Sequence, residues 1–187
     1  VVDGLHRRLS MLSVVFVAVH VVTAVLDSFA PVTLVDAVVP FASSYRPVWL
    51  GLGAVAFDLL VALVVTSLLR ARLGVRAWRS VHWLAYACWP FALVHALGSG
   101  SDVRAGWMLW LGIGSAALVA VAVVGRAAIA FRPAAATAAG VAVAALALAV
   151  WLPSGPLAKG WARKAGTPPS LLGAGRSHGS SAKGKTR

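Results

Sequence analysis

Five apolar segments, each close to the length of a membrane-spanning helix, restrict what this chain can fold into. A helix needs roughly 20 apolar residues to cross the hydrocarbon core, and it satisfies its backbone polar groups internally. Of the 187 residues, 60% are hydrophobic, and the mean hydropathy is +0.86. The sequence therefore predicts an all-α, polytopic membrane helix bundle of about five transmembrane helices within residues 1–152. The predicted spans cover residues 9–26, 47–69, 81–97, 107–124 and 134–152.

Two further segments have the composition of loops. Residues 27–46 contain two prolines and two aspartates, which predicts a loop with a short interfacial segment that lies over the bundle. Residues 153–187 are rich in Gly, Ser, Pro and Lys, so we expect a solvated, disordered basic tail.

The arginines set the expected orientation. The net charge of +12 comes mainly from basic residues between the apolar segments or in the tail, so we expect lipid rather than nucleic acid as the partner. The positive-inside rule places eight arginines in the cytoplasm and only Arg46 and Arg104 in the outer loops. Five spans that start in the cytoplasm put the tail outside, although the tail carries seven Lys and Arg. The composition is that of a GC-rich bacterial genome, so we expect a multi-pass protein of a bacterial plasma membrane. The eight arginines expected in the cytoplasm are Arg7, Arg8, Arg70, Arg72, Arg76, Arg79, Arg126 and Arg132.

Four of the five histidines form two pairs with nearly equal spacing. His6 and His20 lie 14 residues apart, and His82 and His95 lie 13 apart. On a helix these gaps measure about 21 and 19.5 Å, a large part of the roughly 30 Å hydrocarbon core. One span separates the two histidine helices, so they point the same way. We therefore expect His6 level with His82 near the cytoplasmic face, and His20 level with His95 near the outer face.

The helix phase of the second pair is uneven. A spacing of 13 residues turns His82 away from His95 by about 140° on an ideal helix. Pro90 lies between them and removes the hydrogen bond to the Tyr86 carbonyl, so it can bend or re-phase the helix. The sequence leaves open whether this kink or the tilt of the helix brings both histidines to one face.

The paired histidines favour haem over other chemistries. The sequence has no HExxH motif for a bare metal ion, and a proton relay would need more acids than the five aspartates present. Bis-imidazole ligation of haem needs only one histidine from each of two helices. Two facing pairs therefore predict two haems, one near each membrane face. The alternative is a purely structural role, in which each imidazole only forms hydrogen bonds inside the bundle.

Two stretches around the histidines carry a family resemblance. The stretch WRSVHWLAYACWPFALVHALGSGSD is the more specific, and LHRRLSMLSVVFVAVH supports it. They resemble the ferric reductase-like transmembrane domain of NADPH oxidases, ferric-chelate reductases and the haem-binding subunit of the periplasmic methionine sulfoxide reductase. The resemblance covers residues 5–125 and implies that His6 and His82 ligate an inner haem b, and His20 and His95 an outer one. The family usually has a helix before the first histidine helix, and we expect this chain to lack it.

Several other residues are candidates for supporting roles. Haem propionates need cationic partners, which Arg79 and either Arg7 or Arg8 could supply at the inner face, and Arg46 at the outer face. Contact with lipid headgroups is the other interpretation of the inner arginines. Asp58 is the only acidic residue deep in a span, and it could orient a ligand histidine, pass a proton or simply be bonded inside the bundle.

The chain has no evident module that accepts hydride. It contains no GxGxxG motif, and its tail is too short and polar for a flavin or nicotinamide domain. We therefore predict a dihaem b-type electron-transfer protein. It would be an oxidoreductase component that receives its electrons from a separate flavoprotein, quinol or reductase. The alternatives are a small proton- or metal-coupled transporter that uses Asp58 and the histidines, a haem-binding membrane anchor subunit of a periplasmic reductase, and a passive membrane anchor whose tail docks a partner.

Overall fold

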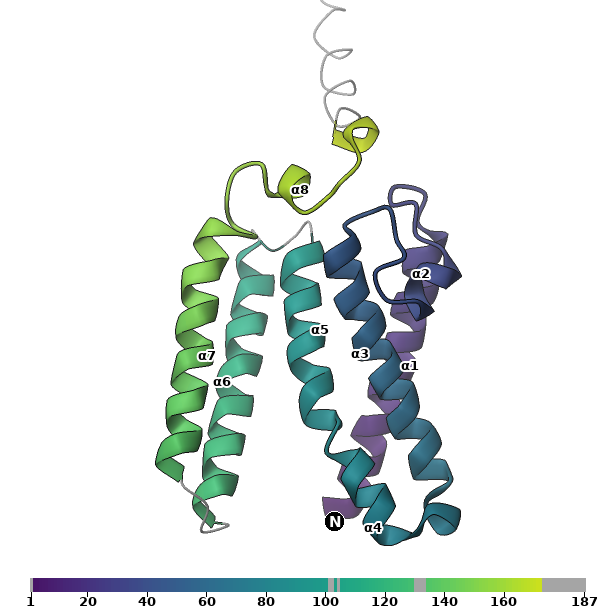
Figure 1. Ribbon diagram of the computed structural model, residues 1–187, viewed down its shortest axis with the longest axis vertical. Helices are drawn as coiled ribbons and strands as arrows, with labels where there is room; N and C mark the ends of the chain where they lie inside the picture. Colours follow the sequence, from purple (N-terminus) through teal and green to yellow (C-terminus); the bar gives the residue numbers. More distant parts are fainter. Residues whose placement is uncertain (1, 101–102, 104, 130–133, 173–187) are drawn as a thin grey trace, which may run out of the picture. The chain divides into compact units, whose positions relative to one another are not determined.

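The computed structural model describes residues 2–100, 103, 105–129 and 134–172, and every regular element in them is a helix (Figure 1). The predicted all-α, polytopic membrane bundle is confirmed. Four helices among the described residues are long and apolar enough to cross a bilayer, and they match the first, second, fourth and fifth predicted spans. They are Gly4–Leu26, Pro47–Leu68, Gly106–Ile129 and Ala135–Ser154.

The chain divides into two compact units, and the first holds all four membrane histidines. It consists of residues 1–99 and 162–187. Its core lies along α3 and α5, where Ala54, Leu63 and Leu97 are buried. Small residues on this seam let the two backbones approach closely. The first five helices are α1 (Val2–Leu26), α2 (Leu34–Val38), α3 (Pro47–Leu68), α4 (Arg70–His82) and α5 (Ala85–Ser99).

Helix α1 packs much less closely than its neighbours. Among the described residues, none of the closely packed helix pairs includes α1. No residue in its apolar window is buried, and Leu9 and Phe16 are 53% and 65% exposed. Apolar side chains on this scale must be covered by lipid or by another group when the helix lies in a membrane.

The loop between α1 and α3 contains a short ordered segment, as predicted. Helix α2 begins with a capping box in which Thr33 and Asp36 satisfy each other's backbone N–H groups. The chain then turns at Phe41, whose φ of 65° is unusual for a residue with a side chain. The ring of Phe41 lies against Gly51, where any side chain would collide with it. The loop is thereby fixed to the first turns of α3.

The third predicted span differs from the prediction. The sequence predicts one helix over residues 81–97, but the structure divides this region between α4 and α5. At the break, the N–H groups of Leu84 and Tyr86 bond to carbonyls only three residues back. Pro90 lies inside α5, beyond the break. The two shorter helices explain why this region is missing from the four full-length spans.

The second unit consists of residues 100–161 and contains none of the four membrane histidines. Its helices α6 (Gly106–Ile129) and α7 (Ala134–Ser154) pack side by side (Figure 1). After α7 the chain turns, and the rings of Trp151 and Trp161 meet edge to face at 6.2 Å. The unit is a hairpin of two apolar helices, which is the arrangement expected for two consecutive membrane spans.

The segment after α7 differs from the disordered tail expected for residues 153–187. The chain forms α8 (Trp161–Lys164) and continues into a stretch in which Thr167 is buried. The Thr167 hydroxyl accepts a hydrogen bond from Nε of Arg46, at 2.9 Å. This contact fixes the first part of the expected tail to the loop before α3. Residues 173–187 lie outside the described residues.

Candidate functional site

The structure brings the four membrane histidines together in two pairs. The ring centres of His6 on α1 and His82 at the end of α4 are 6.2 Å apart, with the ring planes at 82°. Those of His20 on α1 and His95 on α5 are 6.3 Å apart, at 76°. We call these the inner pair and the outer pair. The partners are those expected from the sequence, and their role as ligands remains a prediction.

The break between α4 and α5 explains how His82 and His95 both reach α1. On one ideal helix their spacing of 13 residues would turn them apart by about 140°. The three-residue hydrogen bonds at the break wind the chain more tightly than an α-helix and change the phase of α5 relative to α4. The break therefore contributes to the change of phase between the two histidines.

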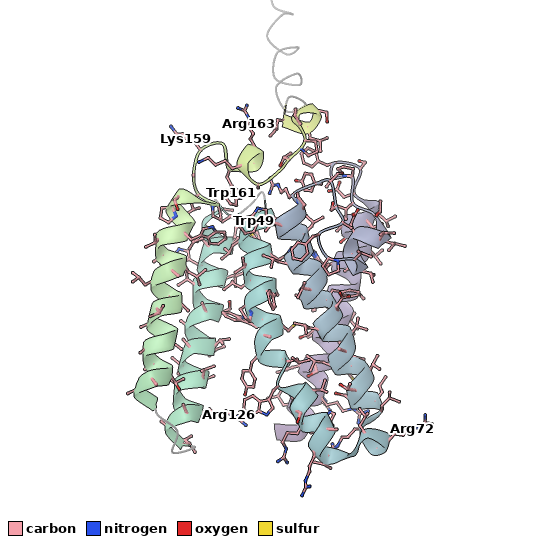
Figure 2. All side chains as sticks on the ribbon, in the orientation of Figure 1. Trp49, Arg72, Arg126, Lys159, Trp161 and Arg163 are labelled. Atoms are coloured by element: carbon pink, nitrogen blue, oxygen red, sulfur yellow. The ribbon has the colours of Figure 1, made fainter. Side chains whose placement is uncertain are left out.

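His95 is held by the backbone of α3. Its Nδ1 donates a hydrogen bond to the carbonyl oxygen of Trp49, at 2.8 Å. Its ring fills the space beside Gly53, where a Cβ would lie 2.5 Å from Nδ1. Trp49 lies at one end of this unit, and Arg72 lies at the other and points away from the helices (Figure 2). A carbonyl oxygen only accepts, so the proton is on Nδ1 and Nε2 keeps the lone pair that a metal needs.

His82 is held by stacked rings instead. The indole of Trp78 stacks on it with ring centres 4.9 Å apart and the planes at 29°. The guanidinium of Arg70 lies 4.7 Å from the centre of the Trp78 ring, and Nε1 of Trp78 donates to Ser67 at 3.4 Å. Nδ1 of His82 is buried and has no hydrogen-bond partner in the described part of the chain. Stacking, rather than a hydrogen bond, therefore orients the inner ligand candidate.

Both pairs have the separation that one metal ion between two imidazoles would require. A metal–imidazole bond is about 2 Å long, and the centre of the ring lies about 1.15 Å beyond its nitrogen. These lengths put the ring centres roughly 6.3 Å apart, and the observed values are 6.2 and 6.3 Å. No group of three or more His, Cys, Asp or Glu that could hold a bare ion occurs among the described residues. The pairs fit a metal whose other ligands come from a macrocycle.

The arginine candidates fall into two classes. Arg7, Arg8 and Arg79 are exposed at the end of the unit that carries the inner pair. Arg46 is only 5% exposed, and its Nη1 donates to the carbonyl of Ser99, one turn after His95. Its backbone N–H donates to Gly166 at 3.1 Å. Arg46 has no ion-pair partner among the described residues, and a buried guanidinium in that state favours an anionic group nearby.

Asp58 does not orient the candidate ligands on α4 and α5. Nδ1 of His95 bonds to Trp49, and Nδ1 of His82 has no partner among the described residues. Cys88 donates its thiol to the carbonyl of Ala56 at 3.3 Å, which ties α5 to α3. The thiol is therefore part of the packing between these two helices.

Sequence reasoning missed the residues that hold the two ligand candidates. Trp78 lies four residues before His82, the helical spacing at which side chains meet. Gly53 lies four residues after Trp49, the position that normally covers a helix carbonyl. Both signals are present in the sequence, but each becomes specific only when the facing helix is known. Arg70 has no comparable signal, because the chain between it and Trp78 is kinked at Gly74, where φ is 76°.

A family comparison covers the part of the chain that holds three of the four membrane histidines. Residues 2–93 match the family model described as "Ferric reductase like transmembrane component". The match includes His6, His20 and His82 and ends two residues before His95. The comparisons with curated proteins and with solved structures found no match. The match supports a ferric reductase-like transmembrane domain over residues 2–93 and, through it, a role in membrane electron transfer.

Proposed function

We propose that this chain is a dihaem b-type membrane protein that passes single electrons between the two faces of the membrane. The observation that carries the proposal is that two histidines of α1 each face a histidine of α4 or α5 at nearly the same ring separation, 6.2 and 6.3 Å. In this arrangement His6 and His82 ligate the inner haem, and His20 and His95 the outer one. The family match supports the electron-transfer role.

A haem bound in each pair supplies reversible one-electron chemistry at its iron. The residues of the chain bind and orient it. His95 presents Nε2 because Trp49 engages Nδ1, and Trp78 fixes the plane of the His82 ring. The two ligand levels on α1 are about 21 Å apart along the helix, so they divide the crossing into two stages.

The arginines would complete the two sites. Arg79 and either Arg7 or Arg8 would pair with the propionates of the inner haem from their exposed positions. Arg46 would serve the outer haem, because its buried guanidinium donates to the carbonyl of Ser99, one turn beyond His95, and has no ion-pair partner in the described residues. A separate flavoprotein, quinol or reductase would exchange electrons with the two faces. In this proposal the protein lies in a bacterial plasma membrane.

The haem content of the purified full chain tests the proposal. A pyridine haemochrome assay should give two haems b per chain, and dithionite should produce the sharp reduced bands of a b-type protein. Changing His178 to Ala, which alters the one histidine outside the two pairs, should leave the content unchanged. A colourless protein would contradict the proposal and favour the transporter, and a single haem per chain would contradict its dihaem form.

A further inference from the structure

Gly53 lies where a side chain would otherwise cover the backbone carbonyl of Trp49. In an α-helix each Cα–Cβ bond tilts toward the N-terminus, so the side chain at position i+4 lies over the carbonyl of residue i. Gly53 stands at this position relative to Trp49 and has no side chain to cover its carbonyl. The imidazole of His95 occupies the vacant space, where a Cβ would lie 2.5 Å from Nδ1 and 2.6 Å from Cε1.

The contacts around Trp49 interlock α3 with α5. The carbonyl of Trp49 accepts from His95, while its indole ring lies against Gly98, three residues further along α5. Any side chain at Gly98 would collide with that indole. One glycine on each helix therefore admits one ring from the other, and the ring of His95 has little freedom to turn.

The hydrogen bond has an electronic consequence for the nitrogen that remains. An imidazole that donates from Nδ1 to a carbonyl is a more basic ligand through Nε2. A more basic ligand stabilises the oxidised metal and lowers its reduction potential. The inner pair differs, because Nδ1 of His82 has no partner among the described residues. The cation of Arg70, stacked through Trp78, also favours the less positive, reduced state at the inner pair.

We propose that Gly53 is a positioning residue for the outer haem: by exposing the Trp49 carbonyl to His95, it fixes Nε2 as the ligand atom and gives the outer site the lower reduction potential of the two. The inference rests on the proposed haem ligation. It concerns a residue that touches neither iron nor haem and acts only through the orientation of His95.

A redox titration of the full haem-loaded chain tests this inference with one pair of variants. Gly53→Ala places a methyl group against His95, whereas the control Gly51→Ala places one against Phe41, an exposed ring in the loop. Both changes add the same atoms to the same helix. We expect Gly53→Ala to shift the lower midpoint potential upward or to remove the outer haem, with the other haem unchanged. Gly51→Ala should keep both potentials and both haems.

Each other outcome overturns the inference. Unchanged potentials and full haem content in Gly53→Ala would show that the hydrogen bond has no effect on the site. A shift of the higher potential, loss of both haems, or the same change in Gly51→Ala would show that the effect is not specific to His95. A wild-type chain without haem would overturn the proposed function itself, so the two failures are distinguishable.

Discussion

The inner and outer histidine pairs have almost the same ring separation, yet the chain builds them in different ways. His95 of the outer pair is fixed by a helix carbonyl and by the space at Gly53, both within the closely packed seam of α3 and α5. His82 of the inner pair lies at the end of α4, beside a helix break, and is oriented by the stacked ring of Trp78. Similar geometry therefore depends on helix packing at one level and on side-chain stacking at the other.

This difference shows which changes each site should tolerate. Haem binding at the outer pair should change with substitutions that alter the approach of α3 to α5, or the contact between Thr167 and Arg46. Haem binding at the inner pair should change when Trp78, which stacks on His82, is replaced. It should not change when only the packing between α3 and α5 is altered.

Removing a single ligand should abolish one site and spare the other. We expect His95→Ala and His82→Ala each to lower the haem content from two per chain to one, because an iron with one axial imidazole is bound much more weakly. The pyridine haemochrome assay measures the content, and redox titration identifies which potential remains. The two variants should retain different potentials. If both variants lost both haems, the two pairs would not be independent sites.

Weakening the contact between Thr167 and Arg46 should affect only the outer pair. Thr167→Val removes the hydroxyl that accepts from Nε of Arg46 and leaves that buried cation with fewer partners. A hydrogen bond to a charged group contributes about 2 kcal/mol, which corresponds to a Tm lower by about 4–8 °C for a chain of this size. The bleaching temperature of the outer haem measures the effect, and Ser170→Ala, at an exposed position nearby, is the control. An equal shift for both haems would contradict the separation of the two sites.

Removing the stacked indole should weaken only the inner pair. Stacked aromatic pairs contribute about 1 kcal/mol beyond the area they bury, so Trp78→Leu should speed haem loss from the inner site roughly fivefold. Transfer of haem to an excess of an apoprotein scavenger measures the rate. Trp83→Leu is the matched control, because the indole of Trp83 stacks on Tyr86 and not on a histidine. A faster loss from the outer site in Trp78→Leu would show that the stack does not belong to the inner pair.

Most of the fold could be predicted from the sequence, because span length and apolar character are local properties. Four spans agree with the structure, and the loop before α3 contains a short helix as expected. The division of residues 81–97 between two helices was not predictable, because the break comes before Pro90 and depends on the turn at Leu84. The order in residues 153–172 was also missed, since it depends on the distant contact between Thr167 and Arg46.

The candidate site was predictable as a set of residues but not as a set of contacts. The nearly equal spacing of the histidines was enough to pair His6 with His82 and His20 with His95, because both histidine helices were expected to point the same way. The partners of the imidazoles were not predictable, since Gly53 and Trp78 gain their roles only when α3 and α4 are placed against the histidines. The spacing of the histidines therefore predicted which residues form the candidate site. The contacts of their rings depend on how the helices face one another.

Electron paramagnetic resonance of the oxidised full chain tests the central claim most directly. In both pairs the imidazole planes are nearly perpendicular, at 82° and 76°. Perpendicular imidazoles leave two d orbitals of ferric iron almost equal in energy, which gives a highly anisotropic low-spin signal. We predict two such signals, each abolished by replacing the histidines of one pair. A spectrum dominated by high-spin haem, or one without low-spin haem signals, would contradict the assignment of two bis-histidine sites.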